Sequence, residues 1–202
     1  MKARGIRRRH KKGAMKHKWS MSADLSGPHP TAIGTDFRYL LVGVVTLDDE
    51  DQSRLPFVKG LTSKKGEEVA MKIQEILIEV RAITGARHSL VRFHSDAGKE
   101  FVNAETKKVL DKNGIFQSHT GGYDPKSNGL AERYVGIIKH SAASLLAHSG
   151  LSLVFWYWAA VQAAYQYRSK VLGAPMPAGA PTFGDRVLIR NIEGENLSLI
   201  HI

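Results

Sequence analysis

The sequence predicts an α/β fold, in which a mixed five-stranded sheet carries helices on both faces. Three strand-like segments open the folded part without a helix between them, which favours an antiparallel meander. Helical and strand-like segments then alternate, as in parallel crossovers, and two long helical segments follow. With 43% hydrophobic residues, the 202-residue chain can build one core but not two large ones.

The three opening strands are expected at 19–26, 37–47 and 55–61. The first ends at a Gly-Pro pair, which forces a turn. The second, FRYLLVGVVTL, is a nearly continuous β-branched and aliphatic run, the pattern of a buried strand. An acidic turn separates it from the third.

The next helix is expected to have Thr62 or Ser63 as its N-cap and to stop at Gly85. Its apolar residues recur at helical spacing: Val69, Ile73, Ile76, Leu77, Val80 and Ile83. A strand at 88–93 and a short helix at 103–113 follow.

A fifth strand, at 115–119, precedes a glycine-containing loop at 121–127. Two helices are expected at 128–148 and 152–171, with Gly150 between them. The first of these has one apolar face: Leu130, Tyr134, Ile137, Ile138, Ala142 and Leu145.

The chain is expected to divide into a basic arm at 1–18, one folded domain at 19–174, and a linker with the start of a further segment at 175–202. Three prolines mark the linker, and a strand at 185–192 starts a further segment that the chain does not complete. The last residues, 197–202, resemble a translated sequencing adaptor, so no function is assigned to them.

The net charge of +10 is concentrated in the arm. Its 18 residues hold nine of the 29 Lys and Arg residues and no acid, which leaves 20 basic and 19 acidic residues in the rest. A basic arm attracts polyanions, so nucleic acid is the expected partner. A solvated arm, or a nuclear-import signal at 7–12, is the alternative.

The absence of cysteine excludes disulfides, a cysteine nucleophile and a Cys-ligated zinc site within this chain. No apolar run approaches the about 20 residues of a membrane span, so no membrane partner is expected.

Three carboxylates stand at the ends of predicted elements. Asp24 lies at the end of the first strand, Asp96 follows the fourth, and Glu132 lies in the first turns of the helix at 128–148. Thirty-five residues separate the last two. Asp36, before the second strand, is a rival for the first position.

The sequence around these acids reads DLSGP at 24–28, SDAGKEF at 95–101 and NGLAER at 128–133. In this order and spacing, the three segments resemble the catalytic domain of retroviral and retrotransposon integrases, particularly the Ty1/copia type, over about residues 20–183. The resemblance implies a ribonuclease-H-like architecture and an integrase catalytic core within 19–174. It also implies DNA 3′-end processing and strand transfer into a target duplex.

The resemblance further implies that Asp24, Asp96 and Glu132 are the catalytic and metal-binding residues. Asp24 would bridge two ions, and each of the other two would hold one. Oxygen ligands suit Mg²⁺ or Mn²⁺. Two hard cations about 3.5–4 Å apart stabilise both ends of an in-line displacement at a phosphodiester.

Lys139 lies seven residues after Glu132, off the apolar helix face. By resemblance it holds the element's own DNA end, although an ordinary surface pair is the alternative. Arg133, in the same segment, is also expected to bind DNA.

Tyr123 and Lys126, in the glycine-containing loop, can meet DNA. Asn128 can cap the helix and, by resemblance, touch DNA. His94 and His119 border the predicted site, where structural roles are favoured.

Two other acidic features are interpreted differently from the three carboxylates. The acids at 48–51 are interpreted as a solvated turn. Glu100 is interpreted as a capping or salt-bridging residue.

The aromatic run FWYW at 155–158 suits core or subunit packing better than base stacking, because alanines follow it at helical spacing. By resemblance, a homo-oligomer is expected, which acts in the nucleus after a cytoplasmic particle stage. A complete integrase also has an N-terminal His₂Cys₂ zinc domain, which this cysteine-free chain does not contain. Another ribonuclease-H-like transposase or nuclease, or a catalytically dead relic, remains the alternative.

Overall fold

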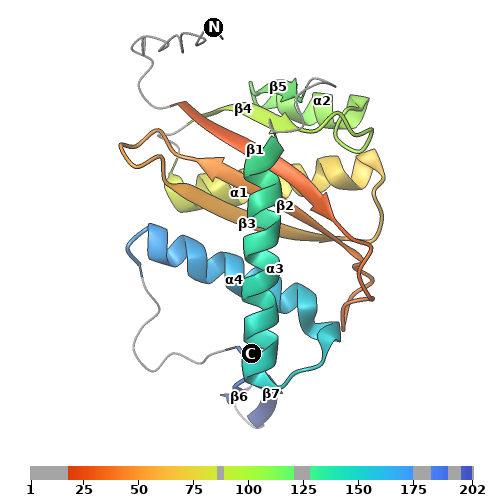
Figure 1. The fold of residues 1–202 in the computed structure, drawn as a ribbon, viewed down its shortest axis with the longest axis vertical. Coiled ribbons are helices and arrows are strands. Elements are labelled where there is room, and N and C mark those ends of the chain that lie inside the picture. The colour runs from red at the N-terminus through yellow and green to blue at the C-terminus, as the bar shows by residue number, and fades with distance from the viewer. Residues whose placement is uncertain (1–17, 86–88, 121–127, 175–182, 191–196, 202) are drawn as a thin grey trace, which may run out of the picture.

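Five strands form the main sheet in the computed structural model, which describes residues 18–85, 89–120, 128–174, 183–190 and 197–201 (Figure 1). The strands are β1 (Lys18–Ser26), β2 (Tyr39–Thr46), β3 (Arg54–Leu61), β4 (Ser89–Ser95) and β5 (Phe116–His119). Their order across the sheet is β3-β2-β1-β4-β5. The first three strands pair antiparallel, whereas β4 runs parallel to β1 and β5 parallel to β4. This mixed sheet confirms the predicted fold class, including its ribonuclease-H-like strand arrangement.

Four α-helices cover the two faces of this sheet (Figure 1). They are α1 (Gly66–Thr84), α2 (Ala104–Lys112), α3 (Gly129–Ser149) and α4 (Trp156–Val171), and a 3₁₀ turn, η2 (Leu153–Phe155), precedes the last. α1 packs on β2 and β3 and contacts α2, while α3 crosses β1 and β2 on the opposite face. α4 packs against α3 and β3. The predicted helices on both faces are therefore confirmed.

Two hydrophobic cores result, one on each face, and β2 contributes to both. Leu41 and Val45 point toward α1, and Leu40, Val42 and Val44 point toward α3 and α4. Alternate side chains of a strand point to opposite faces, so a strand covered on both faces must be apolar throughout. This explains the continuous apolar run of β2.

β1 has a different pattern, because only one of its faces is apolar. Trp19, Met21 and Ala23 are buried in the core beneath α1. The residues that alternate with them on the α3 face are Ser20, Ser22 and Asp24. A polar strip therefore crosses the middle of the sheet on the side that α3 covers.

The start of α1 differs from the prediction. The N-cap residue is Lys65, which makes no capping hydrogen bond with its side chain. Thr62 and Ser63 instead donate their backbone N–H groups to the Glu68 carboxylate, at 2.6 and 2.9 Å. Glu68 accepts the hydrogen bonds of these two N–H groups. The helix therefore starts after Lys65, later than it would with Thr62 or Ser63 as its N-cap.

The predicted helix ends are confirmed. Gly85 follows the last residue of α1, and Gly150 ends α3 in the left-handed conformation at φ 69°. A side chain disfavours that conformation, which explains why glycine stops the helix. None of the helices in the described part of the chain has the length and apolar character of a membrane span.

The aromatic start of α4 packs against the connection between β1 and β2. The Trp156 Nε1–H donates to the Pro30 carbonyl at 2.7 Å, and the Trp158 Nε1–H donates to the Ile33 carbonyl at 3.1 Å. Tyr157 packs edge-on against Phe37 at 4.9 Å between ring centroids. The predicted packing role of this aromatic run within the chain is confirmed.

Near the C-terminus, β6 (Arg186–Arg190) pairs antiparallel with β7 (Leu197–His201). The predicted strand at 185–192 is present as β6, and whether it belongs to a larger segment stays a prediction. Residues 1–17 of the predicted basic arm, the loop at 121–127 and the prolines of the linker lie outside the described residues. The division into three parts therefore stays a prediction.

Candidate active site

Asp24 and Asp96 lie at the same edge of the sheet, on two neighbouring strands. The last residue pair between the parallel strands β1 and β4 is Ser22 with His94. Each aspartate comes two residues after its member of that pair, and neighbouring strands lie about 4.8 Å apart. Asp24 also shares the α3 face with Ser22. Parallel pairing thus sets the two predicted carboxylates next to each other.

Glu132 comes to this edge on the first turn of α3. Glu132 is exposed, and Asn128, one turn earlier, is buried with 3% of its surface accessible. The Asn128 Nδ2–H donates to the carbonyl of Ala23, at 3.4 Å. This contact holds the start of α3 against the residue that precedes Asp24.

The predicted capping role of Asn128 is wrong. Its side chain makes no capping hydrogen bond, because it points toward β1 and not toward the helix N–H groups. The predicted contact of Asn128 with DNA stays a prediction.

The electrostatics of Asp24 link the three predicted carboxylates. Burial raises the pKa of Asp24 most, and the charges of Asp96 and Glu132 raise it further. A hydrogen bond from the Leu25 N–H, at 2.8 Å, and the charge of Lys64 act in the opposite direction. The fold therefore brings Asp96 and Glu132 close enough for their negative charges to act on Asp24, since like charges repel.

Asp96 lies in a tight loop that depends on Gly98. The Gly98 N–H donates to Asp96 Oδ1 at 3.2 Å. A Cβ atom at position 98 would lie 2.7 Å from Glu100 Oε2 and 3.1 Å from Asp96 Oδ1. Glycine at this position therefore lets both carboxylates approach the loop backbone.

The donor set suits a hard divalent cation. Carboxylate oxygens are the ligands that Mg²⁺ and Mn²⁺ prefer, and a cation would offset the repulsion at Asp24. Within the ranges that the structure describes, however, no three His, Cys, Asp or Glu side chains are grouped closely enough to hold a metal ion. The acids converge, but a cation would have to draw them closer.

Lys64 is a neighbour of the site that the sequence analysis did not identify. It lies in the connection from β3 to α1, with its Nζ 5.6 Å from the Tyr39 ring centroid. Tyr39 pairs with Leu61 at the end of β3, so this connection emerges at the same edge as Asp24. The strand directions could have predicted this neighbour. In an antiparallel meander the first and third strands end at the same edge, so residues that follow β3 lie near the end of β1.

The two histidines occupy different surroundings. His94 is buried, with Nδ1 2.9 Å from Ser118 Oγ. With Ser20, Ser22, Arg92 and Leu130, it lines a polar groove of about 360 Å³ on the α3 face. His119 lies in another groove, so only His94 lies on the face that carries Asp24.

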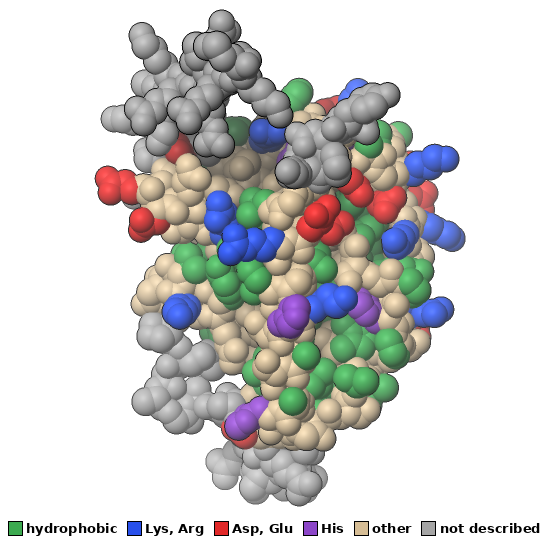
Figure 2. All heavy atoms as spheres, in the orientation of Figure 1, with side chains coloured by type: hydrophobic (Ala, Val, Ile, Leu, Met, Phe, Trp, Pro, Cys, Tyr) green, Lys and Arg blue, Asp and Glu red, His purple; other side chains and the backbone are tan. Residues whose placement is uncertain are grey.

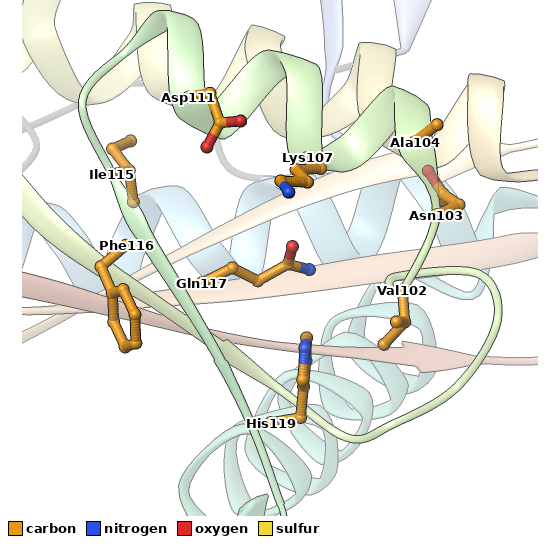
Figure 3. Close-up of a pocket in the computed structure, with 9 residues that line it drawn as sticks. All are labelled: Val102, Asn103, Ala104, Lys107, Asp111, Ile115, Phe116, Gln117 and His119. Carbon is orange, nitrogen blue, oxygen red and sulfur yellow. The ribbon is translucent and has the colours of Figure 1, made fainter.

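That other groove, of about 470 Å³, lies between α2 and β5 (Figure 3). Lys107 and Asp111 point into it from α2, and Gln117 points into it from β5 (Figure 3). The Gln117 Nε2–H donates to the Phe101 carbonyl at 2.9 Å. None of the three predicted carboxylates lines this groove, so it is separate from the candidate active site.

Two predicted DNA-binding residues lie on α3, and two cannot be placed. Arg133 and Lys139 are exposed on this helix. On the face that α3 crosses, acidic side chains gather toward one end, and Lys or Arg and His side chains lie together farther along (Figure 2). Tyr123 and Lys126 lie outside the described residues.

The rival acids lie apart from the three carboxylates. Asp36 is exposed in the connection between β1 and β2. Asp49 lies in the turn between β2 and β3, at the opposite end of the sheet from Asp24. Hydrogen bonds from the Ser53 hydroxyl and from the Ser53 N–H, the latter at 2.6 Å, lower the pKa of Asp49. The interpretation of this acidic run as a solvated turn agrees with its place.

Comparisons with known proteins give the following. No protein-family model matches the chain. A stretch of 61 residues is 43% identical to the transposon-derived protein F54H12.3 of Caenorhabditis elegans, and it covers 30% of this chain and 19% of that relative. The catalytic core domain of BIV integrase is a structural neighbour, with 19% sequence identity and a TM-score of 0.48, over 74% of this chain and 82% of that one. The chain thus spans about a fifth of the curated relative.

Proposed function

We propose that this chain is the catalytic core of a retrotransposon integrase, which processes DNA 3′ ends and joins them to a target duplex. In this proposal Asp24, Asp96 and Glu132 are the catalytic residues. The observation that carries it is the position of Asp24 and Asp96, each two residues beyond the last pair of the parallel strands β1 and β4. The start of α3, which carries Glu132, is held against β1 through Asn128. Acids from three separate segments at one sheet edge form the type of site that phosphoryl transfer needs.

Each acid has a distinct structural support for this role. Asp24 is positioned by β1, and the Leu25 N–H orients its Oδ1. Asp96 is oriented by the Gly98 N–H, and Glu132 is carried by a helix anchored through Asn128. When bound, Mg²⁺ or Mn²⁺ would supply Lewis-acid stabilisation of the charge that develops at the phosphodiester.

The basic side chains around the acids support DNA as the substrate. Lys139 and Arg133 are exposed on the helix that carries Glu132, and Lys64 lies near Asp24. Lysine and arginine bind phosphates and position a strand without reading its sequence. We assign them to holding the backbone on both sides of the reacting phosphodiester.

Two further observations support an origin in a mobile element. The relative of which 61 residues match is named as transposon-derived. The three sequence segments around the acids resemble those of the Ty1/copia type in order and spacing. A homo-oligomer that acts in the nucleus, after a cytoplasmic particle stage, belongs to the same proposal.

The direct test is a joining assay with the full chain. A labelled duplex with a free 3′-hydroxyl is incubated with supercoiled plasmid and Mg²⁺ or Mn²⁺. Joining is expected for the wild type and for Asp51→Asn, an exposed acid in the remote turn, but not for Asp96→Asn or Glu132→Gln. Circular dichroism and the melting temperature establish that the variants fold.

Other outcomes would favour the alternatives. Metal-dependent cleavage without joining indicates a nuclease of the same fold. DNA binding without any reaction, in wild type and variants alike, indicates a relic. Joining that survives Asp96→Asn in a folded protein overturns the assignment of the site.

A further inference from the structure

A small apolar pocket of about 150 Å³ lies where α3 and α4 cross, below β2. Its lining is mostly alkyl: Leu40, Ala142, Ala143, Leu146 and Ala160. Three of these residues are alanines on facing helices, and their small side chains leave the space open. Trp156 is the aromatic residue of the lining beside His29.

The Trp156 side chain is fixed before any ligand arrives. The Trp156 Nε1–H donates to the Pro30 carbonyl at 2.7 Å. The His29 ring packs against the indole at 4.7 Å between centroids. A ligand therefore meets a preorganised surface and does not need to order this side chain, which favours binding.

The volume limits the ligand to one small ring system. An apolar protein cavity of about 150 Å³ binds benzene, so this pocket has room for a single flat ring and not for a bulky group. Flat aromatic ligands stack on tryptophan, as the bases of single-stranded nucleic acids do.

The mouth of the pocket carries a positive charge. Lys139 lines it together with His29. Burial lowers the pKa of His29, and the charge of Lys139 lowers it further, so the imidazole is neutral near pH 7. The neutral ring lies 3.2 Å from Ser26 Oγ through its Nε2. A ligand that joins a flat ring to an anionic group complements this arrangement.

The position of the pocket relative to the candidate active site indicates that this ligand belongs to the DNA substrate. Lys139 lies seven residues after Glu132 on α3, about 10 Å along the helix axis at 1.5 Å per residue. A DNA strand that presents a phosphodiester to Glu132 extends past Lys139 within a few nucleotides.

We propose that this pocket binds one unpaired base of the DNA strand whose phosphate contacts Lys139. The inference rests on the proposed function, because it takes the strand from the candidate active site. A base within a duplex cannot reach such a pocket, so the DNA end must open or the base must rotate out of the stack. Leu153, 70% exposed at the mouth, would cover the edge of the inserted base.

The test uses duplexes whose reactive end carries a short unpaired overhang with 2-aminopurine at single positions. Ala143→Leu narrows the pocket from its exposed side, and Ala147→Leu makes the same change one turn away, at an exposed residue outside the lining. Stacking on Trp156 is expected to quench one 2-aminopurine position in the wild type and in Ala147→Leu. Ala143→Leu is expected to lose this quenching and to bind DNA about 5- to 150-fold more weakly, as one lost base stack implies.

Several outcomes overturn the inference. It fails if Ala143→Leu keeps the quenching, or if Ala147→Leu loses it equally. It also fails if Ala143→Leu changes only the oligomeric state, since the pocket would then receive a protein side chain. Joining by the same proteins is measured in parallel. If joining is absent while quenching remains, the proposed reaction fails and the base pocket stands. If joining is normal while quenching is absent in the wild type, the base pocket fails and the proposed reaction stands.

Discussion

Asp24 and Asp96 stand side by side at one edge of the sheet, each two residues beyond the last residue pair of the parallel strands β1 and β4. This arrangement is electrostatically unfavourable without a cation. Burial and the charges of Asp96 and Glu132 raise the pKa of Asp24, so folding disfavours its ionised form. Active sites that hold buried carboxylates near one another lower the stability of the folded protein, and the protein keeps them because its activity requires them.

The first prediction is that Asp24→Asn stabilises the protein in the presence of a chelator at pH 7.5. The folded-state pKa of Asp24 lies above its unfolded value, so ionisation lowers stability as the pH rises from about 3.8 through the folded pKa. The side-chain amide in Asp24→Asn does not ionise, so the variant does not lose this stability as the pH rises. The melting temperature should rise by about 1–3 °C, and this gain should disappear below pH 4.

The response of the melting temperature to Mg²⁺ should differ between the two proteins. Mg²⁺ should raise the melting temperature of the wild type, because ligands of the folded state stabilise it. It should have little effect on Asp24→Asn. Asp36→Asn, at an exposed acid in the connection between β1 and β2, serves as the control, and an equal response in all three proteins would contradict the prediction.

The second prediction concerns Lys64, whose charge lowers the pKa of Asp24 and so opposes the effect of burial. Lys64→Gln should raise the pKa of Asp24 further and move the acid limb of the pH–rate profile to higher pH. Joining should fall severalfold at pH 6 and less at pH 8. Lys65→Gln, which removes the same charge from the next residue, is the control, and identical profiles for the two variants would exclude a specific role.

The third prediction concerns Gly98, where a Cβ atom would meet the carboxylates of Asp96 and Glu100. Both are ends of flexible side chains, so Gly98→Ala should displace them and leave the fold intact. Mg²⁺-dependent joining should fall about tenfold or more, since mutating the groups that orient metal ligands typically costs about 10- to 100-fold.

Gly136→Ala provides the control for Gly98→Ala, because nothing lies within 4 Å of a Cβ at that position of α3. It should stabilise the protein by about 0.5–1 kcal/mol, the helix preference for alanine over glycine. Unchanged metal dependence in Gly98→Ala would show that the Asp96 loop tolerates a side chain.

The order of strands and helices could be predicted because periodicity and glycine positions carry that information. The apolar run of β2 predicts a strand covered on both faces, and Gly150 predicts the end of α3. The three acids of the candidate site could be predicted as well, because the segments around them are distinctive.

What could not be predicted depends on contacts between distant segments. The cap of α1 was misplaced because Glu68 binds the N–H groups of Thr62 and Ser63. The buried Arg168 reads as an ordinary basic helix end, yet it donates to the Pro56 carbonyl at 2.7 Å and pairs with Glu79 at 3.0 Å. Such partners depend on which strand a helix packs against, which periodicity does not specify.

The final prediction concerns Asn128, which links α3 to β1 through the Ala23 carbonyl. Its Oδ1 is buried and has no hydrogen-bond partner among the described residues, so Asn128→Ala removes one weak bond and one unsatisfied acceptor. The cost in stability should therefore stay within about 1 kcal/mol. Joining should fall by a larger factor, because the first turn of α3 and its Glu132 lose their anchor. Ser144→Ala, at an exposed site of the same helix, should change neither. A joining rate that falls only in proportion to the lost stability would mean that Asn128 supports the fold without positioning Glu132.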